Sequence, residues 1–209
     1  MKLFLSTAAF FLIAVVAISQ NPKVVGDCTV NYSVTQTAGN DNTGATGSVK
    51  TVYIKGLNCR SDITSPSFSQ SIVYNHNTGN AVILRTISQG KFITSLNAAQ
   101  WQQQNNIYDG MKLSLTDEIK TILGYECKKA VALLKNDSTY IVWYATALKP
   151  SIQENPFQFK DVPGFVLEYE AIIKSSKITY TATKINFSPL PASLFAIPTS
   201  GYKELKPAQ

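Results

Sequence analysis

The sequence predicts a mainly β protein, with a strongly curved antiparallel sheet that forms an incomplete (half) barrel covered by one or two short helices. Three observations predict this fold class. Many short segments alternate apolar and polar residues, which is the pattern of half-buried strands. Turn residues separate these segments at intervals of roughly eight to fifteen residues. Beyond the N-terminal region, only one stretch has a clear helical pattern. Strands joined this tightly pair antiparallel, because a parallel pair needs a longer crossover.

The N-terminal region is typical of a secretory signal. Lys2 supplies a positive charge, Leu3 to Ile18 forms an apolar run, and Ala17 and Ser19 are small residues at the end of that run. The run is about sixteen residues long, which is short for a transmembrane helix of roughly twenty residues. We therefore expect residues 1–19 to be a cleaved signal peptide and residues 20–209 to form a single β-rich half-barrel domain. An uncleaved N-terminal anchor is the alternative.

The strand segments follow one another along the expected mature chain. Val30, Tyr32 and Val34 alternate with polar residues, and a glycine-containing polar loop, Thr37 to Ser48, comes next. The further segments with strand character are Val49 to Leu57, Ser69 to Tyr74, Ala81 to Ile87, Lys91 to Leu96, Glu118 to Leu123, Glu126 to Leu134, Thr139 to Ala145, Phe165 to Ile173 and Lys177 to Asn186.

The predicted helix covers Ala98 to Asn105, with Asn97 as its N-cap and Trp101 as its main apolar contact. A single helical turn is also expected at Leu190 to Phe195, between prolines. Both helices are short, so the sheet must supply most of the core.

Composition excludes several classes of function. The net charge of +6 comes from scattered lysines and arginines, so we expect no nucleic-acid binding, which requires a dense cationic surface. The only histidine is His76, and no two of the three cysteines have the spacing of a metal site or a redox pair. We therefore expect no metal and no cofactor.

The cysteines are Cys28, Cys59 and Cys127. In an oxidising compartment, a disulfide between Cys28 and Cys59 with one spare thiol is the first interpretation, because both residues lie at the outer ends of two strand segments joined by the polar loop. Such a loop closure would stabilise the fold by roughly 3–4 kcal/mol. The alternative is three buried thiols that behave as small apolar side chains.

Catalytic motifs are weak. A serine triad needs a histidine base, and His76 lies in a predicted polar turn; no G-x-S-x-G occurs. Glu168 and Glu170 share a face of one strand, but we interpret them as solvated surface charge rather than as a catalytic pair. We expect no enzyme activity and assign no catalytic residue.

One series of motifs resembles a known family. Ile119 to Ala130 reads IKTILGYECKKA, and it is followed by Val142-Trp143-Tyr144, Asn155-Pro156-Phe157 and the stretch Val162 to Glu168, VPGFVLE. In this order the motifs resemble the GLPGLI family of exported bacterial proteins, although Asp161, Val162 and Phe165 replace a glycine and two leucines of its signature. The residues that carry the structural motif are Gly124, Tyr125, Cys127, Lys128, Lys129, Pro163 and Gly164.

The resemblance implies a periplasmic or cell-envelope location in a Gram-negative bacterium and a fold similar to the lipoprotein carrier LolA. The first cysteine, Cys28, lies too far from the apolar run for a lipoprotein anchor, and no transmembrane segment is expected in the mature chain. Proteins of that fold hold apolar groups in their concavity. The resemblance carries over no catalytic residue.

These observations lead to three hypotheses about function. The first is a non-enzymatic domain that binds a hydrophobic ligand, such as a lipid or acyl chain, in the concave face of the half-barrel. Its candidate ligand-binding residues are Trp143, Tyr144, Phe165, Leu167 and Tyr169. The second is an envelope structural module that contacts other envelope proteins and binds no ligand. The third is a hydrolase of an envelope polymer.

Overall fold

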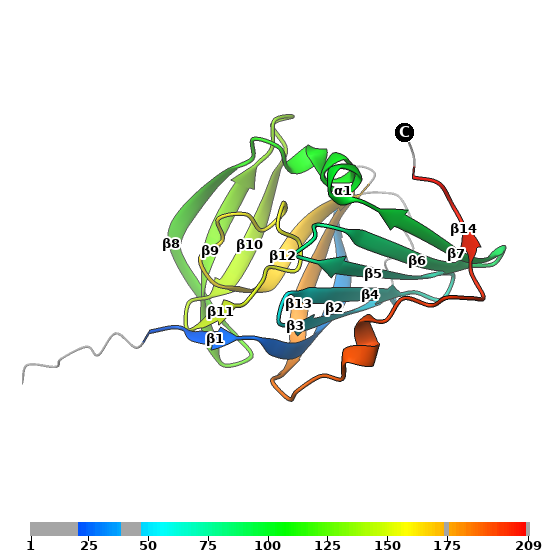
Figure 1. Ribbon diagram of the computed structural model, residues 1–209. Coiled ribbons are helices and arrows are strands. Elements are labelled where there is room, and N and C mark those ends of the chain that lie inside the picture. The colour runs from blue at the N-terminus through cyan, green and yellow to red at the C-terminus, as the bar shows by residue number, and fades with distance from the viewer. Residues whose placement is uncertain (1–20, 39–46, 174–175, 208–209) are drawn as a thin grey trace, which may run out of the picture.

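The computed structural model describes residues 21–38, 47–173 and 176–207, and most of these residues lie in β-strands (Figure 1). The predicted signal peptide, residues 1–19, lies outside the described residues, as does most of the polar loop between Thr37 and Ser48. The prediction of a mainly β protein with a short helix is confirmed.

Twelve strands form one large sheet. In spatial order they are β14 (Lys203–Glu204), β7 (Gly90–Leu96), β6 (Ala81–Ile87), β5 (Ser69–Asn75), β4 (Asn58–Thr64), β3 (Val49–Lys55), β2 (Asp27–Ala38), β13 (Ser176–Asn186), β12 (Phe165–Ile173), β10 (Thr139–Ala145), β9 (Tyr125–Leu133) and β8 (Lys112–Ile122). Every neighbouring pair is antiparallel except β14 and β7. A separate parallel pair joins β1 (Lys23–Val25) to β11 (Leu148–Pro150).

Some predicted strand boundaries match the structure and others do not. The bounds of β10 and β12 match the predicted segments, whereas β8 begins at Lys112 rather than at Glu118. The sequence prediction missed β4, because its residues, NCRSDIT, are mostly polar. A mostly polar strand can occupy this place in the sheet because only one face of β4 points to the interior.

The helix α1 (Ala98–Gln104) begins where it was predicted. Asn97 accepts a hydrogen bond from the backbone of Gln100, and the Gln100 side chain accepts one from the backbone of Asn97, which makes a capping box. Two 3₁₀ helices follow later, η1 (Asn106–Tyr108) and η2 (Ala192–Phe195), and η2 lies within the predicted turn. None of the helices in the described part of the chain has the length and apolar character that crossing a bilayer requires.

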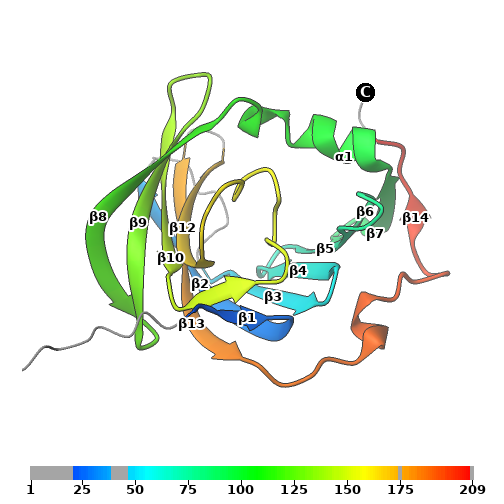
Figure 2. The same cartoon turned by 60° about the vertical axis from the view of Figure 1, so that its left-hand side comes forward.

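The two faces of the sheet have different coverings. We call the face that carries Lys50, Tyr169 and Tyr180 the inner face, and the face that carries Glu168 and Thr181 the outer face. Figure 2 shows α1 and the yellow loop after β11 on the same side of the sheet. Both contribute side chains to a pocket on the inner face. On the outer face, the chain after β13 passes β4, where Arg60 Nη1 donates a hydrogen bond to the carbonyl oxygen of Leu194 at 2.8 Å.

Part of the inner face is filled by the chain itself. We call residues 151–164 the inner segment. Its side chains Ile152, Phe159 and Val162 are buried in the main hydrophobic core, and the Phe159 ring packs edge-on against Tyr169 at 4.9 Å between centroids. Tyr140 Oη donates a hydrogen bond to the carbonyl oxygen of Gln158 at 2.5 Å, which ties the segment to β10. The apolar hollow expected from the sequence is therefore largely packed at this end.

The predicted disulfide is wrong, because Cys28, Cys59 and Cys127 are all free thiols. Cys28 on β2 pairs with Ile54 on β3, and Ile54 pairs with Cys59 on β4. Two strand spacings therefore separate the cysteines, roughly 9–10 Å, whereas a disulfide needs Cα atoms within about 7 Å. The prediction failed because the turn at Gly56 and the strand β4 were not recognised. All three thiols are buried, as the alternative interpretation stated.

Candidate functional site

The pocket that we call the main pocket lies on the inner face between the sheet, α1 and the inner segment. Its volume is about 200 Å³. Its walls combine apolar, aromatic and polar side chains. They come from strands β3, β4, β5, β12 and β13, from α1 and from the inner segment. The lining residues are Lys50, Cys59, Ser61, Ile63, Gln70, Ile72, Tyr74, Trp101, Glu154, Asn155, Gln158, Tyr169, Ala171 and Tyr180. A larger hollow of about 680 Å³ lies elsewhere, beside Asp27, Lys55 and η2.

An ion pair between Lys50 and Glu154 forms part of this wall. Lys50 comes from β3 and Glu154 from the inner segment, and their side chains are only 11% and 13% exposed. The Lys50 ammonium also donates a hydrogen bond to the hydroxyl of Tyr169. Ser61 Oγ on β4 donates to Glu154 Oε1 at 3.0 Å. These contacts fix the inner segment against three strands.

Three tyrosine rings surround the Lys50 ammonium. Its nitrogen lies 5.0 Å from the centroids of Tyr169 and Tyr180 and 6.0 Å from that of Tyr32. Tyr169 and Tyr180 stack on each other with centroids 4.7 Å apart. Such rings attract a cation through their electron-rich faces. They offset part of the cost of burying the lysine.

The tyrosine hydroxyls stay protonated at neutral pH. Burial raises the pKa of Tyr169 well above its ordinary value, and the negative charge of Glu154 raises it further. The same two causes, with a smaller contribution from Tyr108, raise the pKa of Tyr180 to about 12. The pocket therefore presents neutral hydroxyl groups next to one cation and one anion.

The helix and the inner segment close the pocket together. Trp101 of α1 lies against Tyr74 of β5 with ring centroids 6.0 Å apart. Asn155 Nδ2 donates to Asn105 Oδ1 at 2.9 Å, which joins the inner segment to the end of the helix. Asn155 Oδ1 in turn accepts from the backbone of Phe157 and Gln158, and so shapes the segment.

Two side chains of the pocket contain buried donors without a protein partner. Across residues 21–35, 47–172 and 176–207, three buried side-chain polar atoms have no hydrogen-bond partner, and two of them are Trp101 Nε1 and Gln158 Nε2. Each of these two side chains belongs to a residue that is 7% exposed. Buried polar groups in native proteins are normally hydrogen-bonded, so such a pair beside one pocket is unusual.

The five predicted ligand-binding residues lie in different places. Tyr169 lines the main pocket, and Phe165 borders a much smaller apolar cavity of about 10 Å³ beside Phe159. Leu167 and Tyr144 are buried in the main core. Trp143 is half-buried near the Lys120 ammonium, 4.4 Å from its ring centroid. The structure thus brings one of the five to the main pocket.

The sequence did not predict a role in the pocket for Lys50, Glu154, Trp101 or Gln158. Trp101 was recognised only as a helix contact. Lys50 carried a usable signal, because it occupies an inward position in the alternating pattern of β3, between Ser48 and Val52. Glu154 carried none, because it lies in a loop.

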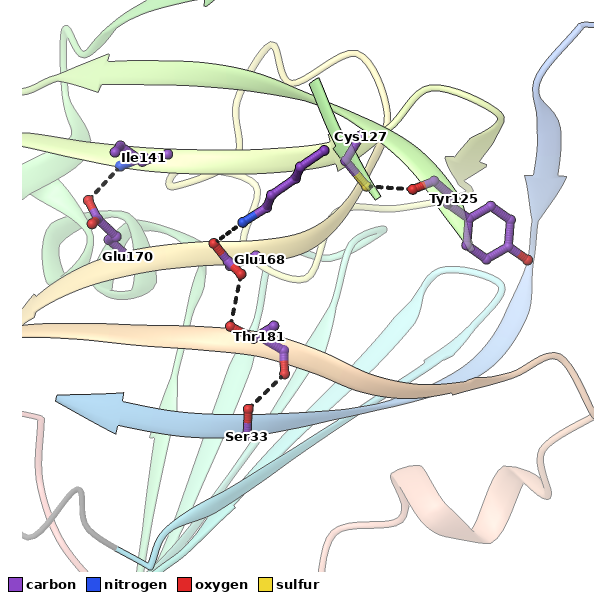
Figure 3. A network of polar contacts seen from close by, with 8 residues as sticks. Ser33, Tyr125, Cys127, Ile141, Glu168, Glu170 and Thr181 are labelled. Atoms are coloured by element: carbon purple, nitrogen blue, oxygen red, sulfur yellow. Dashed lines mark hydrogen bonds and ion pairs between the residues drawn. The ribbon is translucent and has the colours of Figure 1, made fainter. Parts of the chain in front are cut away.

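The outer face carries a polar network instead (Figure 3). Glu168 accepts hydrogen bonds from Lys120 Nζ at 2.5 Å and from Thr181 Oγ1 at 3.0 Å. Glu170 accepts one from the backbone of Ile141 at 3.0 Å and pairs with Lys177. The two carboxylates that the hydrolase hypothesis would use are therefore both engaged in structural contacts.

The predicted motif residues lie at two turns. Leu123 and Gly124 form the two-residue connection between β8 and β9, and both have positive φ, +51° and +81°. This is the geometry of a type I′ hairpin, which glycine adopts without strain. Tyr125 and Cys127 follow on β9, where Cys127 Sγ contacts the carbonyl oxygen of Tyr125 at 3.6 Å (Figure 3). Lys128 and Lys129 are half-buried, and Lys129 pairs with Glu118.

The second turn, Pro163-Gly164, ends the inner segment. A Cβ atom on Gly164 would lie 2.3 Å from the carbonyl oxygen of Ala145 and 2.7 Å from a ring carbon of Tyr144. Only glycine allows the chain to pass this close to the end of β10. The turn therefore sets where the inner segment leaves the core.

Comparison with known proteins identifies a family. Residues 39–193 match the family described as "N-glycanase peptide, N-terminal domain". The chain belongs to this family. It is a different family from the GLPGLI family that the motifs resemble. No match was found among curated proteins.

Three solved structures are similar to this chain. PNGF-II, in space group C2, is 17% identical with a TM-score of 0.44, and the match covers 86% of this chain and 30% of PNGF-II. MucB is 7% identical with a TM-score of 0.41, over 83% of this chain and 58% of MucB. The Mycobacterium tuberculosis lipoprotein LppX is 11% identical with a TM-score of 0.33, over 80% of this chain and 89% of LppX. The chain thus spans less than a third of the length of PNGF-II.

Proposed function

We propose that this chain is an exported, non-enzymatic domain that binds a small molecule in the main pocket of its inner face. The observation that carries the proposal is the pocket itself, in which a nearly buried ion pair and aromatic rings line the same space of about 200 Å³. Binding sites typically combine apolar and aromatic walls with a few polar groups that orient the ligand.

Family membership supports an accessory role. The family description is that of an N-terminal domain of an N-glycanase, and the chain matches under a third of PNGF-II. We propose that the domain serves a larger secreted or periplasmic glycan-processing system by holding a ligand rather than by catalysing a reaction. The paired state of Glu168 and Glu170, and the position of His76 next to Tyr74 and the carbonyl oxygen of Gln153, support a non-catalytic role.

The proposed shape is the incomplete barrel expected from the sequence. Tyr32 Oη on β2 donates to the carbonyl oxygen of Val166 on β12 at 2.9 Å, across the intervening strand β13. Lys50 on β3 contacts Tyr169 on β12, with two strands between them. Contacts that skip strands on one face are what a sheet curved toward that face makes.

The pocket favours a ligand with polar groups over a purely hydrophobic one. At about 200 Å³ it is smaller than the 300–1,000 Å³ typical of sites for drug-sized ligands. An acyl chain against Lys50 and Glu154 would cover their charges without offering hydrogen bonds, which is costly. A lipid or acyl ligand stays the second candidate, and the apolar wall residues Ile63, Ile72 and Ala171 support it.

An interaction with other envelope proteins has its own support. The edge strand β8 exposes Leu115 and Ile119, which are 56% and 60% exposed. Exposed apolar side chains on a sheet edge are typical of contact surfaces. This surface lies apart from the pocket residues in the sheet order, so both functions are compatible.

A ligand screen with a blocked pocket tests the proposal. Ala171→Phe places a ring into the pocket, and Ile172→Phe on the same strand is the control, because Ile172 is an exposed residue that does not line the pocket. We expect at least one small amphiphile, sugar or fatty acid to raise the Tm of the unmodified chain through mass action. The shift should vanish in Ala171→Phe and persist in Ile172→Phe. A shift that both variants retain would place binding elsewhere.

A further inference from the structure

We propose that the main pocket takes one ring of a neutral sugar, with Lys50 and Glu154 bound to neighbouring hydroxyl groups. This inference rests on the proposed function and names the class of its ligand. It begins from the cation and the anion that lie side by side in the wall of this pocket.

The ion pair has hydrogen-bonding capacity left over. A lysine ammonium has three donor hydrogens, and Lys50 directs two of them to Tyr169 and Glu154. Both contacts that Glu154 makes with described residues use Oε1, one from Lys50 and one from Ser61. One donor and one carboxylate oxygen are therefore left beside each other. A pair of adjacent hydroxyl groups, one accepting and one donating, matches this arrangement.

The charges favour a neutral ligand. Lys50 and Glu154 neutralise each other, so a bound carboxylate or phosphate would leave an unbalanced charge in a mostly buried site. Hydroxyl groups add no charge and satisfy both members of the pair. The pocket should therefore bind a neutral sugar more tightly than an acidic one.

The walls match the other parts of a sugar ring. Trp101, Tyr74 and Tyr180 supply aromatic surface for the C–H face of the ring. Ser61 and Gln70 add polar atoms to the same walls, which suits a ligand with hydroxyl groups better than an acyl chain.

The two tryptophans of the chain give a direct assay. Trp101 lines the pocket and Trp143 does not, so Trp143→Phe leaves a single tryptophan that reports on the pocket. In this background we would titrate methyl glycosides of glucose, mannose, galactose and N-acetylglucosamine, with decanoate and glucuronate as the acyl and acidic comparisons. We expect a saturable change in Trp101 fluorescence with at least one neutral glycoside and none with glucuronate.

Variants of the pair then test its role. Glu154→Gln should weaken binding of that glycoside about 10- to 100-fold, the usual effect of losing a charged hydrogen bond. Glu168→Gln is the matched control, because Glu168 pairs with a lysine on the outer face, and it should leave the affinity unchanged. Equal loss in both variants would overturn the proposal.

A second variant keeps the test decisive if Glu154→Gln does not fold. Lys50→Met combined with Glu154→Leu replaces the buried ion pair with an apolar pair of similar size, which should cost little stability. The same double variant should lose glycoside binding. Glycoside binding that the folded double variant retains would overturn the proposal.

The outcomes separate this inference from the proposed function. Binding of decanoate with no response to any neutral glycoside overturns the sugar assignment and leaves the pocket as a ligand site. A folded chain that responds to none of the probes, with no Tm shift in the wider ligand screen, overturns both. Neutral glycoside binding that Glu154→Gln weakens and that the double variant loses supports both.

Discussion

Two lysine–glutamate pairs, one on each face of the sheet, show how much the surroundings decide what an ion pair does. Lys50 and Glu154 on the inner face are 11% and 13% exposed, whereas Lys120 and Glu168 on the outer face are 33% and 18% exposed. Both lysines lie over aromatic rings. The inner lysine contacts three rings and a hydroxyl, and the outer lysine contacts one.

The inner pair joins the sheet to a loop, and the outer pair joins strands of the sheet to each other. Glu154 belongs to the inner segment, so its contacts with Lys50 and Ser61 hold that segment in place. Glu168 belongs to β12, which the backbone ladder already holds. Losing the inner pair should therefore change the position of a segment that lines the pocket, whereas losing the outer pair should change little.

The largest expected effect is a fall in the free energy of unfolding at alkaline pH, caused by titratable groups that are buried on the inner face. Burial, helped by Asp27, raises the pKa of Cys28 from 9.0 to about 12, and burial together with Glu154 raises that of Tyr180 from 10.0 to about 12. Between about pH 9 and pH 12 the unfolded chain has released these protons and the folded chain has not. The free energy of unfolding must then fall as pH rises, and its full value is present below about pH 9.

We expect the chain to unfold within this alkaline range, because several buried groups contribute and each pKa unit is worth about 1.4 kcal/mol. Circular dichroism and tyrosinate absorbance should change together along the titration. Tyr180→Phe should make the decline with pH shallower. A free energy of unfolding that stays constant between about pH 9 and pH 12 would show that the inner face is open to solvent.

The next effect compares the two pairs directly. Lys50→Met should lower the free energy of unfolding by about 3–5 kcal/mol, because Glu154 is left buried without its partner. Lys120→Met should cost about 0–1 kcal/mol, because its pair is more exposed than the inner one and Glu168 keeps the hydrogen bond from Thr181. Urea denaturation with an unchanged m-value would measure both.

A double variant sharpens this result. Lys50→Met combined with Glu154→Leu should recover most of the loss, since an apolar pair of similar size replaces a buried ion pair at little cost. Equal losses in Lys50→Met and Lys120→Met would mean that the inner pair is as well hydrated as the outer one.

The third effect concerns two glycines that are required for different reasons. Gly164→Ala should cost about 1–3 kcal/mol, because its Cβ would overlap the backbone of Ala145 and neighbouring atoms must move. Gly124→Ala should cost about 1 kcal/mol, because no atom lies within 4 Å of the added Cβ and only the positive φ is strained. Thermal unfolding of the two variants would rank them, and the reverse order would contradict this account.

The same contrast shows what the sequence could predict. Strands rich in β-branched and aromatic residues, such as β10 and β12, were found because these residue types favour strands. The strand β4 and the position of Cys59 were missed because most residues of β4 are polar. The helix was found from Asn97 and Trp101, which are local signals.

The pocket could not be predicted in the same way. Lys50 and Glu154 are more than a hundred residues apart in sequence, and Glu154 lies in a loop with no periodic pattern. Their meeting depends on where the inner segment folds back, which Gly164 and Asn155 decide through close contacts. Local patterns do not encode such contacts, so the prediction chose aromatic strand residues and found only Tyr169.

The smallest expected effect tests the corrected cysteine assignment. A disulfide between Cys28 and Cys59 would stabilise the chain by roughly 3–4 kcal/mol, whereas the structure places Ile54 between them and leaves all three thiols free. Reducing agent should therefore leave the Tm unchanged. Thiol titration should find no reactive cysteine in the folded chain at neutral pH and three after unfolding without reductant, because burial keeps these thiols protonated and inaccessible. One thiol instead of three would show that strands β2 and β4 come closer together than a sheet with β3 between them allows.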